Sequence, residues 1–215
     1  KKLNTVYIGG GTPTTLEPYQ LDRLLTRIQS KFDTEHLQEF TVEAGRPDSI
    51  TREKLQVLLD HGVDRISVNP QSLEDHVLTA IGRRHTARDV EEAMALATGM
   101  GFPHVNMDLI AGLPWEDLGS FFRSFDQVYR MKPDQLQLGF LKVLKGSYMA
   151  SQAGAYGLRY RMTPPYEVLS TRWLSYGDVI RLKAMEEMVE VYYNSGQFFR
   201  TLSLLEKEYA SPSQL

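Results

Sequence analysis

The sequence predicts an α/β protein built on a parallel sheet, and three observations lead to this prediction. Short apolar runs alternate with longer amphipathic segments at a period of about 30 residues, the length of a βαβ repeat. Three adjacent glycines, Gly9 to Gly11, directly follow the first apolar run. The length of 215 residues, with 42% hydrophobic and 24% charged residues, suits a globular chain with a substantial core.

Five short segments rich in β-branched or large apolar residues are the expected strands. They are residues Leu3 to Ile8, Glu39 to Glu43, Arg65 to Val68, Val105 to Ile110 and Gln135 to Phe140. In a parallel sheet of this kind, ligands bind beyond the carboxyl ends of the strands.

The segments between the strands have helical periodicity. The expected helices are Pro18 to Ser30, Thr51 to His61, Glu74 to Ile81, Ala87 to Gly99 and Asp117 to Met131. In the first helix four leucine or isoleucine residues share one face: Leu21, Leu24, Leu25 and Ile28. Thr51 is suited to cap the second helix, and Gly62 is suited to end it.

The C-terminal part has a different pattern. Glycines and tyrosines between residues 139 and 160 indicate a loop-rich lid rather than a long helix, and Pro164-Pro165 indicates an extended junction. One amphipathic helix is expected from about Asp178 to Tyr192. A shorter helix from Phe198 to Tyr209 is expected to pack beside it through Phe199, Leu202 and Leu205. The predicted division is a barrel part over residues 1–145 and a lid with C-terminal helices over residues 146–215.

Composition excludes several classes of function. The net charge of −3 and the absence of basic runs argue against nucleic acid as a partner. Without a long apolar run or a signal-peptide pattern, the sequence predicts a cytoplasmic protein with no membrane partner. The chain has no cysteine, and its five histidines lack metal-ligand spacing, so no metal site is expected.

Polar residues gather after the predicted strands. Gly9 to Thr14 follows the first strand, Glu43 ends the second, Gln71 follows the third, and Asp108 lies within the fourth. Each loop alone could be a simple turn. Together, at one edge of a parallel sheet, these side chains are suited to accept hydrogen bonds from hydroxyl and ammonium groups of one small ligand.

Arg83-Arg84-His85 lies in the connection between two predicted helices. One interpretation is a solvated helix end, where basic side chains favour the negative end of the helix dipole. The other is a guanidinium group that binds a ligand carboxylate. The residues themselves leave both open.

Five motifs, in order and spacing, resemble the radical S-adenosylmethionine (SAM) enzymes of the oxygen-independent coproporphyrinogen III oxidase type. They are the segments at residues 8–14, 40–47, 65–72, 81–85 and 106–114. The resemblance implies a partial (β/α)6 TIM-type barrel with a helical C-terminal extension. It also implies a 4Fe-4S cluster and SAM as cofactors, with reductive cleavage of SAM to a 5'-deoxyadenosyl radical.

The resemblance further implies seven cofactor-binding residues, each matched to a motif position: Gly10, Gly11, Thr12, Glu43, Gln71, Arg84 and Asp108. The glycine motif is expected to hold the SAM amino group through its backbone, with Glu43 as a contacting carboxylate. Gln71 and Asp108 are expected at the ribose. Arg84 is expected on the SAM carboxylate. No catalytic residue is assigned.

The chain departs from the family because the Cys-x-x-x-Cys-x-x-Cys loop that holds the cluster is missing. We therefore expect a fragment that begins at the second barrel strand, binds no cluster and generates no radical. The resemblance implies an electron donor protein as a partner of the parent. In such a fragment the strand Leu3 to Ile8 is an exposed sheet edge, so we expect the chain to self-associate.

From about Asp108 onward the sequence is similar to the C-terminal part of radical SAM proteins that often carry a cobalamin-binding domain. This leaves the substrate open, with a tetrapyrrole as one small-molecule candidate. Two functions are retained: a radical SAM oxidoreductase core, inactive as this cysteine-free chain, and a non-catalytic module that binds a ligand or partner. A phosphate-binding TIM-type enzyme is held in reserve.

Overall fold

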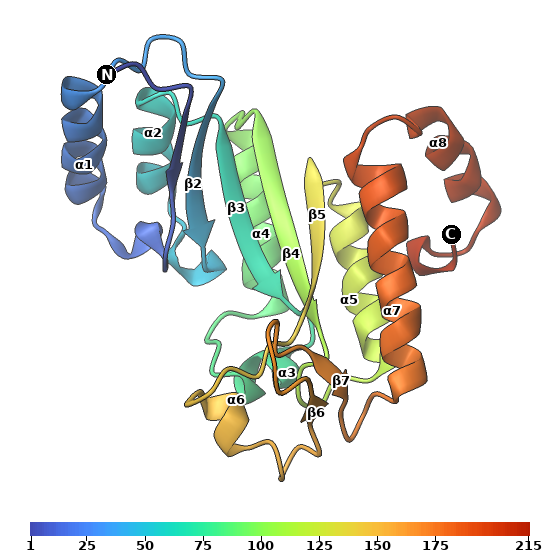
Figure 1. Ribbon diagram of the computed structural model, residues 1–215. Helices are drawn as coiled ribbons and strands as arrows, with labels where there is room; N and C mark the ends of the chain where they lie inside the picture. The colour runs from blue at the N-terminus through green and yellow to red at the C-terminus, as the bar shows by residue number, and fades with distance from the viewer. The chain divides into compact units, whose positions relative to one another are not determined.

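The computed structural model describes residues 1–215, and the five longer strands form one sheet in the chain order β1-β2-β3-β4-β5 (Figure 1). Strand β1 pairs with β2 in parallel, and β2 pairs with β3 in parallel. The sheet is open, with no closed barrel. The predicted α/β class and parallel sheet are confirmed. The strands are Thr5–Ile8 (β1), Glu39–Gly45 (β2), Arg65–Gln71 (β3), His104–Ala111 (β4) and Gln135–Phe140 (β5).

The chain divides into two compact units. The division at residue 145 expected from the sequence stays a prediction. The first unit comprises residues 1–70 and 88–107, and the second comprises residues 71–87 and 108–215. The helices of the first unit are Pro13–Thr15 (η1), Pro18–Lys31 (α1), Pro47–Ser49 (η2), Arg52–Asp60 (α2) and, apart from its first residue, Ala87–Gly99 (α4).

In the first unit, apolar residues of the strands are covered by helices. Phe40 and Val42 of β2 and Ile66 of β3 are buried, as are Leu21 of α1 and Leu55 of α2. Helix α1 packs against α2. The side chain of His61, at the end of α2, bonds to Asp22 and Gln29 of α1 at 2.9 and 2.8 Å. The amphipathic helices expected from the leucine spacing are therefore the ones that cover the sheet.

The second unit contains the C-terminal helices and a small hairpin. Its elements are Asp75–Ala80 (α3), Leu118–Arg130 (α5), Tyr148–Ser151 (α6), Arg159–Tyr160 (β6), Val168–Ser170 (β7), Tyr176–Met188 (α7), Val189–Asn194 (η3), Phe199–Glu208 (α8) and Pro212–Gln214 (η4). Strands β6 and β7 pair antiparallel. A buried cluster joins Val77 of α3, Leu113, Leu141 and Val168. None of the helices combines the length and the apolar character needed to cross a bilayer.

Asp178 lies near the start of helix α7, as expected, and Ser175 caps this helix by accepting a hydrogen bond from the backbone N–H of Asp178 at 3.2 Å. Two other predicted details of the C-terminal helices are wrong. Beyond Met188 the α-helix gives way to a π-helical stretch, η3. Phe199 is 74% exposed and does not pack as expected, because it is the first residue of α8 and that helix buries no residue.

Candidate functional site

The glycine turn of the first unit directly follows the carboxyl end of β1. Gly10 and Gly11 have φ angles of 86° and 148°, in the region that glycine adopts without strain. A Cβ atom built on either residue would meet no atom within 4 Å. The backbone on this side of the turn is therefore open, and its main-chain atoms can come close to a ligand.

Glu43, near the end of the neighbouring strand β2, lies against this turn. The backbone N–H of Gly10 donates a hydrogen bond to Glu43 Oε2 at 3.2 Å, and the hydroxyl of Tyr7 donates one to Oε1. Burial and the Glu43 carboxylate raise the pKa of Tyr7 to about 12, so the phenol stays a donor at neutral pH. The carboxylate is thus fixed beside the open glycine backbone, where it can accept hydrogen bonds from an ammonium group.

Gly9 has no side chain, and this allows Tyr7 and Glu43 to lie close to the turn. A Cβ atom on Gly9 would lie 2.5 Å from Cε1 of Tyr7 and 2.8 Å from Oε2 of Glu43. Either distance is shorter than any ordinary contact. A side chain at this position would therefore displace Tyr7 or Glu43.

The segment after the glycine turn is held by buried polar contacts. Thr14 is fully buried; its hydroxyl donates to the carbonyl of Ala44 and lies 2.6 Å from Oγ of Ser49. Nζ of Lys54 donates to the Thr14 carbonyl at 2.6 Å. These bonds connect the turn to η2 and α2, so contacts with these two helices help to fix the position of the turn.

A row of polar side chains marks the face of the sheet on which Glu43 lies. Arg65 of β3 pairs with Glu39 of β2 at 3.4 Å and donates to Oδ1 of Asn106 in β4 at 3.1 Å. Alternate residues of a strand share a face, so Glu43, four positions after Glu39, lies on the same polar face.

Gln71 and Asp108, in the second unit, are brought together. Nε2 of Gln71 donates to Oδ2 of Asp108 at 3.4 Å, and both residues are half-buried. Gln71 has a φ of 69°, which is uncommon for a residue other than glycine. An amide and a carboxylate side by side can bind a vicinal pair of hydroxyls, as in a ribose.

Arg84 lies in the connection between α3 and α4, and it is exposed. The adjacent His85 is buried, at 2% exposure. An exposed guanidinium suits both interpretations of this segment, a solvated helix end and a carboxylate ligand, so its binding role stays a prediction. Thr12 is half-buried directly after the glycines, and its role also stays a prediction.

Tyr7 belongs to this site, although it was not among the residues expected there from the sequence. The signal was present, because Tyr7 is a polar aromatic residue on the strand that leads into the glycine turn. Its hydroxyl could be assigned to Glu43 only once the pairing of β1 with β2 set Tyr7 opposite Thr41.

The residues of this chain do not fit an iron-sulfur cluster. The chain has no cysteine, and no group of three or more His, Cys, Asp or Glu side chains is arranged to hold a metal ion. The open glycine turn with its fixed carboxylate, in contrast, fits the amino acid part of a ligand such as SAM.

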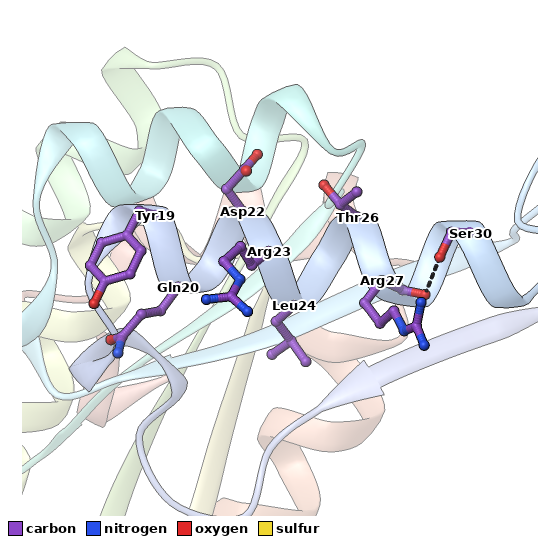
Figure 2. A pocket seen from close by; sticks show the side chains of 8 residues that line it. All are labelled: Tyr19, Gln20, Asp22, Arg23, Leu24, Thr26, Arg27 and Ser30. Carbon is purple, nitrogen blue, oxygen red and sulfur yellow. Dashed lines mark hydrogen bonds between the residues drawn. The ribbon is translucent and has the colours of Figure 1, made fainter.

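A separate surface depression runs along α1, and Figure 2 shows the side chains that line it. They are Tyr19, Gln20, Asp22, Arg23, Leu24, Thr26, Arg27 and Ser30. All eight belong to one helix, whereas ligand pockets are concave and collect residues from several elements. The depression is therefore not the candidate site.

Comparison with known proteins identifies the family. Residues 1–125 match the family described as the Radical SAM superfamily. The chain belongs to the radical SAM superfamily. Residues 154–215 match DUF4080, a family described as a protein of unknown function. The predicted resemblance to radical SAM enzymes is confirmed.

Two curated relatives show which radical SAM proteins the chain is similar to. It is 42% identical over 156 residues to the oxygen-independent coproporphyrinogen-III oxidase-like protein HemZ of Bacillus subtilis, a match that covers 72% of this chain and 31% of the relative. It is 43% identical over 118 residues to the heme chaperone HemW of Lactococcus lactis, which covers 55% of this chain and 31% of the relative. The chain thus spans 31% of the length of each.

A solved structure supports the radical SAM fold. Coproporphyrinogen III oxidase (HemN) from Escherichia coli, described as a radical SAM enzyme, aligns with a TM-score of 0.71 at 23% identity. The alignment covers 90% of this chain and 42% of that one. At this level of identity the likeness concerns the fold alone, and it agrees with the predicted partial TIM-type barrel.

Proposed function

We propose that this chain forms the SAM-binding part of a radical SAM protein related to HemN, HemZ and HemW. The observation that carries the proposal is the Glu43 carboxylate, held by Tyr7 and Gly10 beside a glycine turn whose backbone is open. Membership of the superfamily supports it, because SAM is the cofactor that the family name implies.

In this proposal each group of residues holds one part of SAM. Glu43 and the backbone of Gly10, Gly11 and Thr12 take the amino group, and exposed Arg84 takes the carboxylate. Gln71 and Asp108 take the ribose hydroxyls, for which their paired amide and carboxylate are suited. When bound, SAM supplies a sulfonium whose carbon–sulfur bond is cleaved upon reduction in the family's chemistry.

The chain itself is proposed to bind SAM without generating a radical. Its residues do not fit the cluster that would deliver the electron, since it has no cysteine. Radical oxidoreductase activity on a small molecule, with a tetrapyrrole as one substrate class and an electron donor protein as partner, is proposed only for a whole protein that includes this part. The lack of cysteine also favours the second candidate, a ligand-binding module that uses no radical chemistry.

Calorimetric titration of the chain with SAM tests the binding proposal. We expect saturable binding by the wild type and about tenfold weaker binding by Glu43→Gln, because a charge-assisted hydrogen bond to the ammonium is lost. Glu35→Gln, a change at an exposed glutamate of the same unit, is the matched control and should bind like the wild type. Absence of binding by the wild type, or equal binding by Glu43→Gln, would contradict the proposal.

A second measurement separates binding from chemistry. The chain is incubated anaerobically with iron, sulfide, a strong reductant and SAM, and 5'-deoxyadenosine is assayed by chromatography. We expect none above the rate without protein. Turnover by this chain would overturn the proposal that it only binds SAM.

A further inference from the structure

A carboxyl group, Glu116, is enclosed in the second unit next to the segment that carries Gln71. Glu116 lies between β4 and α5 and is 0% exposed. Its Oε1 accepts a hydrogen bond from the hydroxyl of Ser72 at 2.7 Å, whereas its Oε2 is buried without a hydrogen-bond partner. A buried carboxylate with one satisfied oxygen is costly, so the neutral carboxylic acid is the favoured form.

The buried network around Glu116 holds the backbone that follows Gln71. Oγ of Ser124 in α5 accepts the backbone N–H of Leu73 at 3.0 Å and lies 3.4 Å from Oγ of Ser72. Oγ of Ser72 in turn accepts the backbone N–H of Glu74 at 3.2 Å. Ser72 and Ser124 are 0% and 1% exposed. The three residues after Gln71 are therefore fixed to α5 through two hydroxyls and one carboxyl group.

Gln71 needs such support because its own backbone is strained. Its φ of 69° places a residue with a Cβ atom in a region that favours glycine, a conformation that persists only when the surrounding structure imposes it. The next residue, Ser72, is the one that Glu116 holds. In this conformation Nε2 of Gln71 reaches Asp108.

We infer that Glu116, as a neutral carboxylic acid, is a positioning residue that holds Gln71 toward Asp108 and so prepares the ribose end of the SAM site. This inference rests on the proposed function for its ligand, although the positioning itself does not require one. Glu116 acts through Ser72 and touches no ligand.

The charges around Glu116 agree with a neutral form. Burial raises the pKa of Glu116 to about 8, the Ser72 hydroxyl opposes this shift, and the carboxylates of Glu74 and Asp117 add to it. Arg123 of α5 pairs with Glu74 at 2.8 Å. His76 of α3 lies 3.8 Å from Glu74 and bonds to the Trp115 carbonyl at 3.2 Å.

The sign of the pH dependence follows from this shift. Because the folded-state pKa lies above that of the unfolded chain, the contribution of Glu116 is fully present below about pH 4.5, declines between that pH and about 8, and is lost above it. The ordering of Leu73 and Glu74 should follow the same profile.

The test compares Glu116→Gln, which keeps a neutral acceptor for Ser72, with Glu116→Ala, which removes it. The ligand-free readouts are amide hydrogen exchange at Leu73 and Glu74 and the NMR shift of the Gln71 side-chain amide. We expect exchange in Glu116→Ala to be about tenfold faster and the Gln71 signal to move. Glu116→Gln should resemble the wild type at about pH 4.5 and differ from it increasingly as the pH rises toward 8, because only the wild type loosens over this range. Glu187→Gln, a change at an exposed residue of the same unit, should alter neither the amide exchange at Leu73 and Glu74 nor the Gln71 signal.

His76→Gln identifies the titrating group, because the wild-type profile should persist in this variant. Unchanged exchange and an unchanged Gln71 signal in Glu116→Ala would overturn the inference, as would a pH profile that Glu116→Gln retains. SAM affinity is then measured on the same variants, with about tenfold weaker binding expected only for Glu116→Ala. If the wild type binds no SAM, the proposed function fails, while the exchange and NMR results still decide whether Glu116 positions Gln71.

Discussion

Oε1 of Glu43 accepts a hydrogen bond from the hydroxyl of Tyr7, a residue 36 positions earlier in the chain. The parallel pairing of β1 with β2 makes this contact, because it sets Tyr7 opposite Thr41 and so near Glu43. The open glycine turn begins two residues after Tyr7. A single carboxylate is thus oriented both by a neighbouring strand and by the turn itself, and this orientation underlies the proposed SAM site.

Gly9→Ala should disrupt the site while leaving the fold intact. The new methyl group would meet exposed Tyr7 and half-buried Glu43, whose side chains would move away and take the carboxylate from the glycine turn. We expect SAM affinity to fall about tenfold, the loss of one charge-assisted bond. Gly99→Ala is the matched control, because a Cβ there meets nothing within 4 Å and lies in a helix. Equal affinity of both variants would show that Gly9 is not critical.

The titration of Tyr7 should differ between wild type and Glu43→Gln. Burial first, and then Glu43, raise the pKa of Tyr7 to about 12, so removal of the carboxylate should lower it toward the ordinary value. The stabilisation linked to protonated Tyr7 is fully present below the unfolded pKa of about 10 and is lost as the pH rises through 12. NMR of labelled tyrosine, with Tyr7→Phe to assign the signal, measures this. An unchanged pKa in Glu43→Gln would contradict the contact.

Thr14→Val should destabilise the first unit by about 1–3 kcal/mol, because the buried carbonyl of Ala44 and the hydroxyl of Ser49 lose a partner without any gain in space. Thr15→Val provides the comparison, because the Thr15 hydroxyl also donates to a carbonyl, that of Thr12 at 2.7 Å, but at an exposed position. Urea unfolding of both variants measures the difference. A change in unfolding free energy as small for Thr14→Val as for Thr15→Val would show that the support of the glycine turn is not needed for stability.

The side chain of Asn194 forms hydrogen bonds with two backbone groups of β5. Its side-chain amide accepts the N–H of Leu136 at 3.0 Å and donates to the Leu136 carbonyl at 3.0 Å, and it lies at the end of the π-helical stretch η3. Asn194→Ala should cost about 1–3 kcal/mol in unfolding free energy, because both backbone groups lose a partner. Exchange of the Leu136 amide should also accelerate. Gln197→Ala, a change at an exposed residue nearby, should alter neither the unfolding free energy nor the exchange of the Leu136 amide. If Asn194→Ala also left both quantities unchanged, water would replace the side-chain amide without loss of stability.

The order and type of the main elements could be predicted because each depended on local patterns. The strand Gln135 to Phe140 was placed at its observed bounds, and Thr51 and Asp117 cap the helices that they precede. Helix α5 illustrates the reason: the backbone N–H of Ser120 donates to Asp117 at 2.8 Å, and the Ser120 hydroxyl accepts the Asp117 N–H at 2.8 Å. Such capping is encoded within four residues.

The features of the fold and the site that could not be predicted depend on contacts between residues far apart in the sequence, which local patterns do not contain. Glu116 reads as a polar loop residue, and only folding places Ser72 and Ser124 around it. The π-helical stretch accompanies the bonds from Asn194 to β5 and so could not be read from the apolar spacing of α7. The strand ends led us to expect Gln71 and Asp108 near one ligand, but neither their direct hydrogen bond nor the left-handed backbone of Gln71 could be predicted from the sequence.

The most direct test of the central claim is NMR titration of the isotope-labelled chain with SAM, with each perturbed amide assigned. The account predicts saturable shifts at the backbone amides of Gly10, Gly11 and Thr12 and at the side-chain amide of Gln71. It also predicts that Glu43→Gln weakens all of them together. Shifts confined to the helix α1 depression of Figure 2, or no saturable shift at the glycine turn, would contradict it.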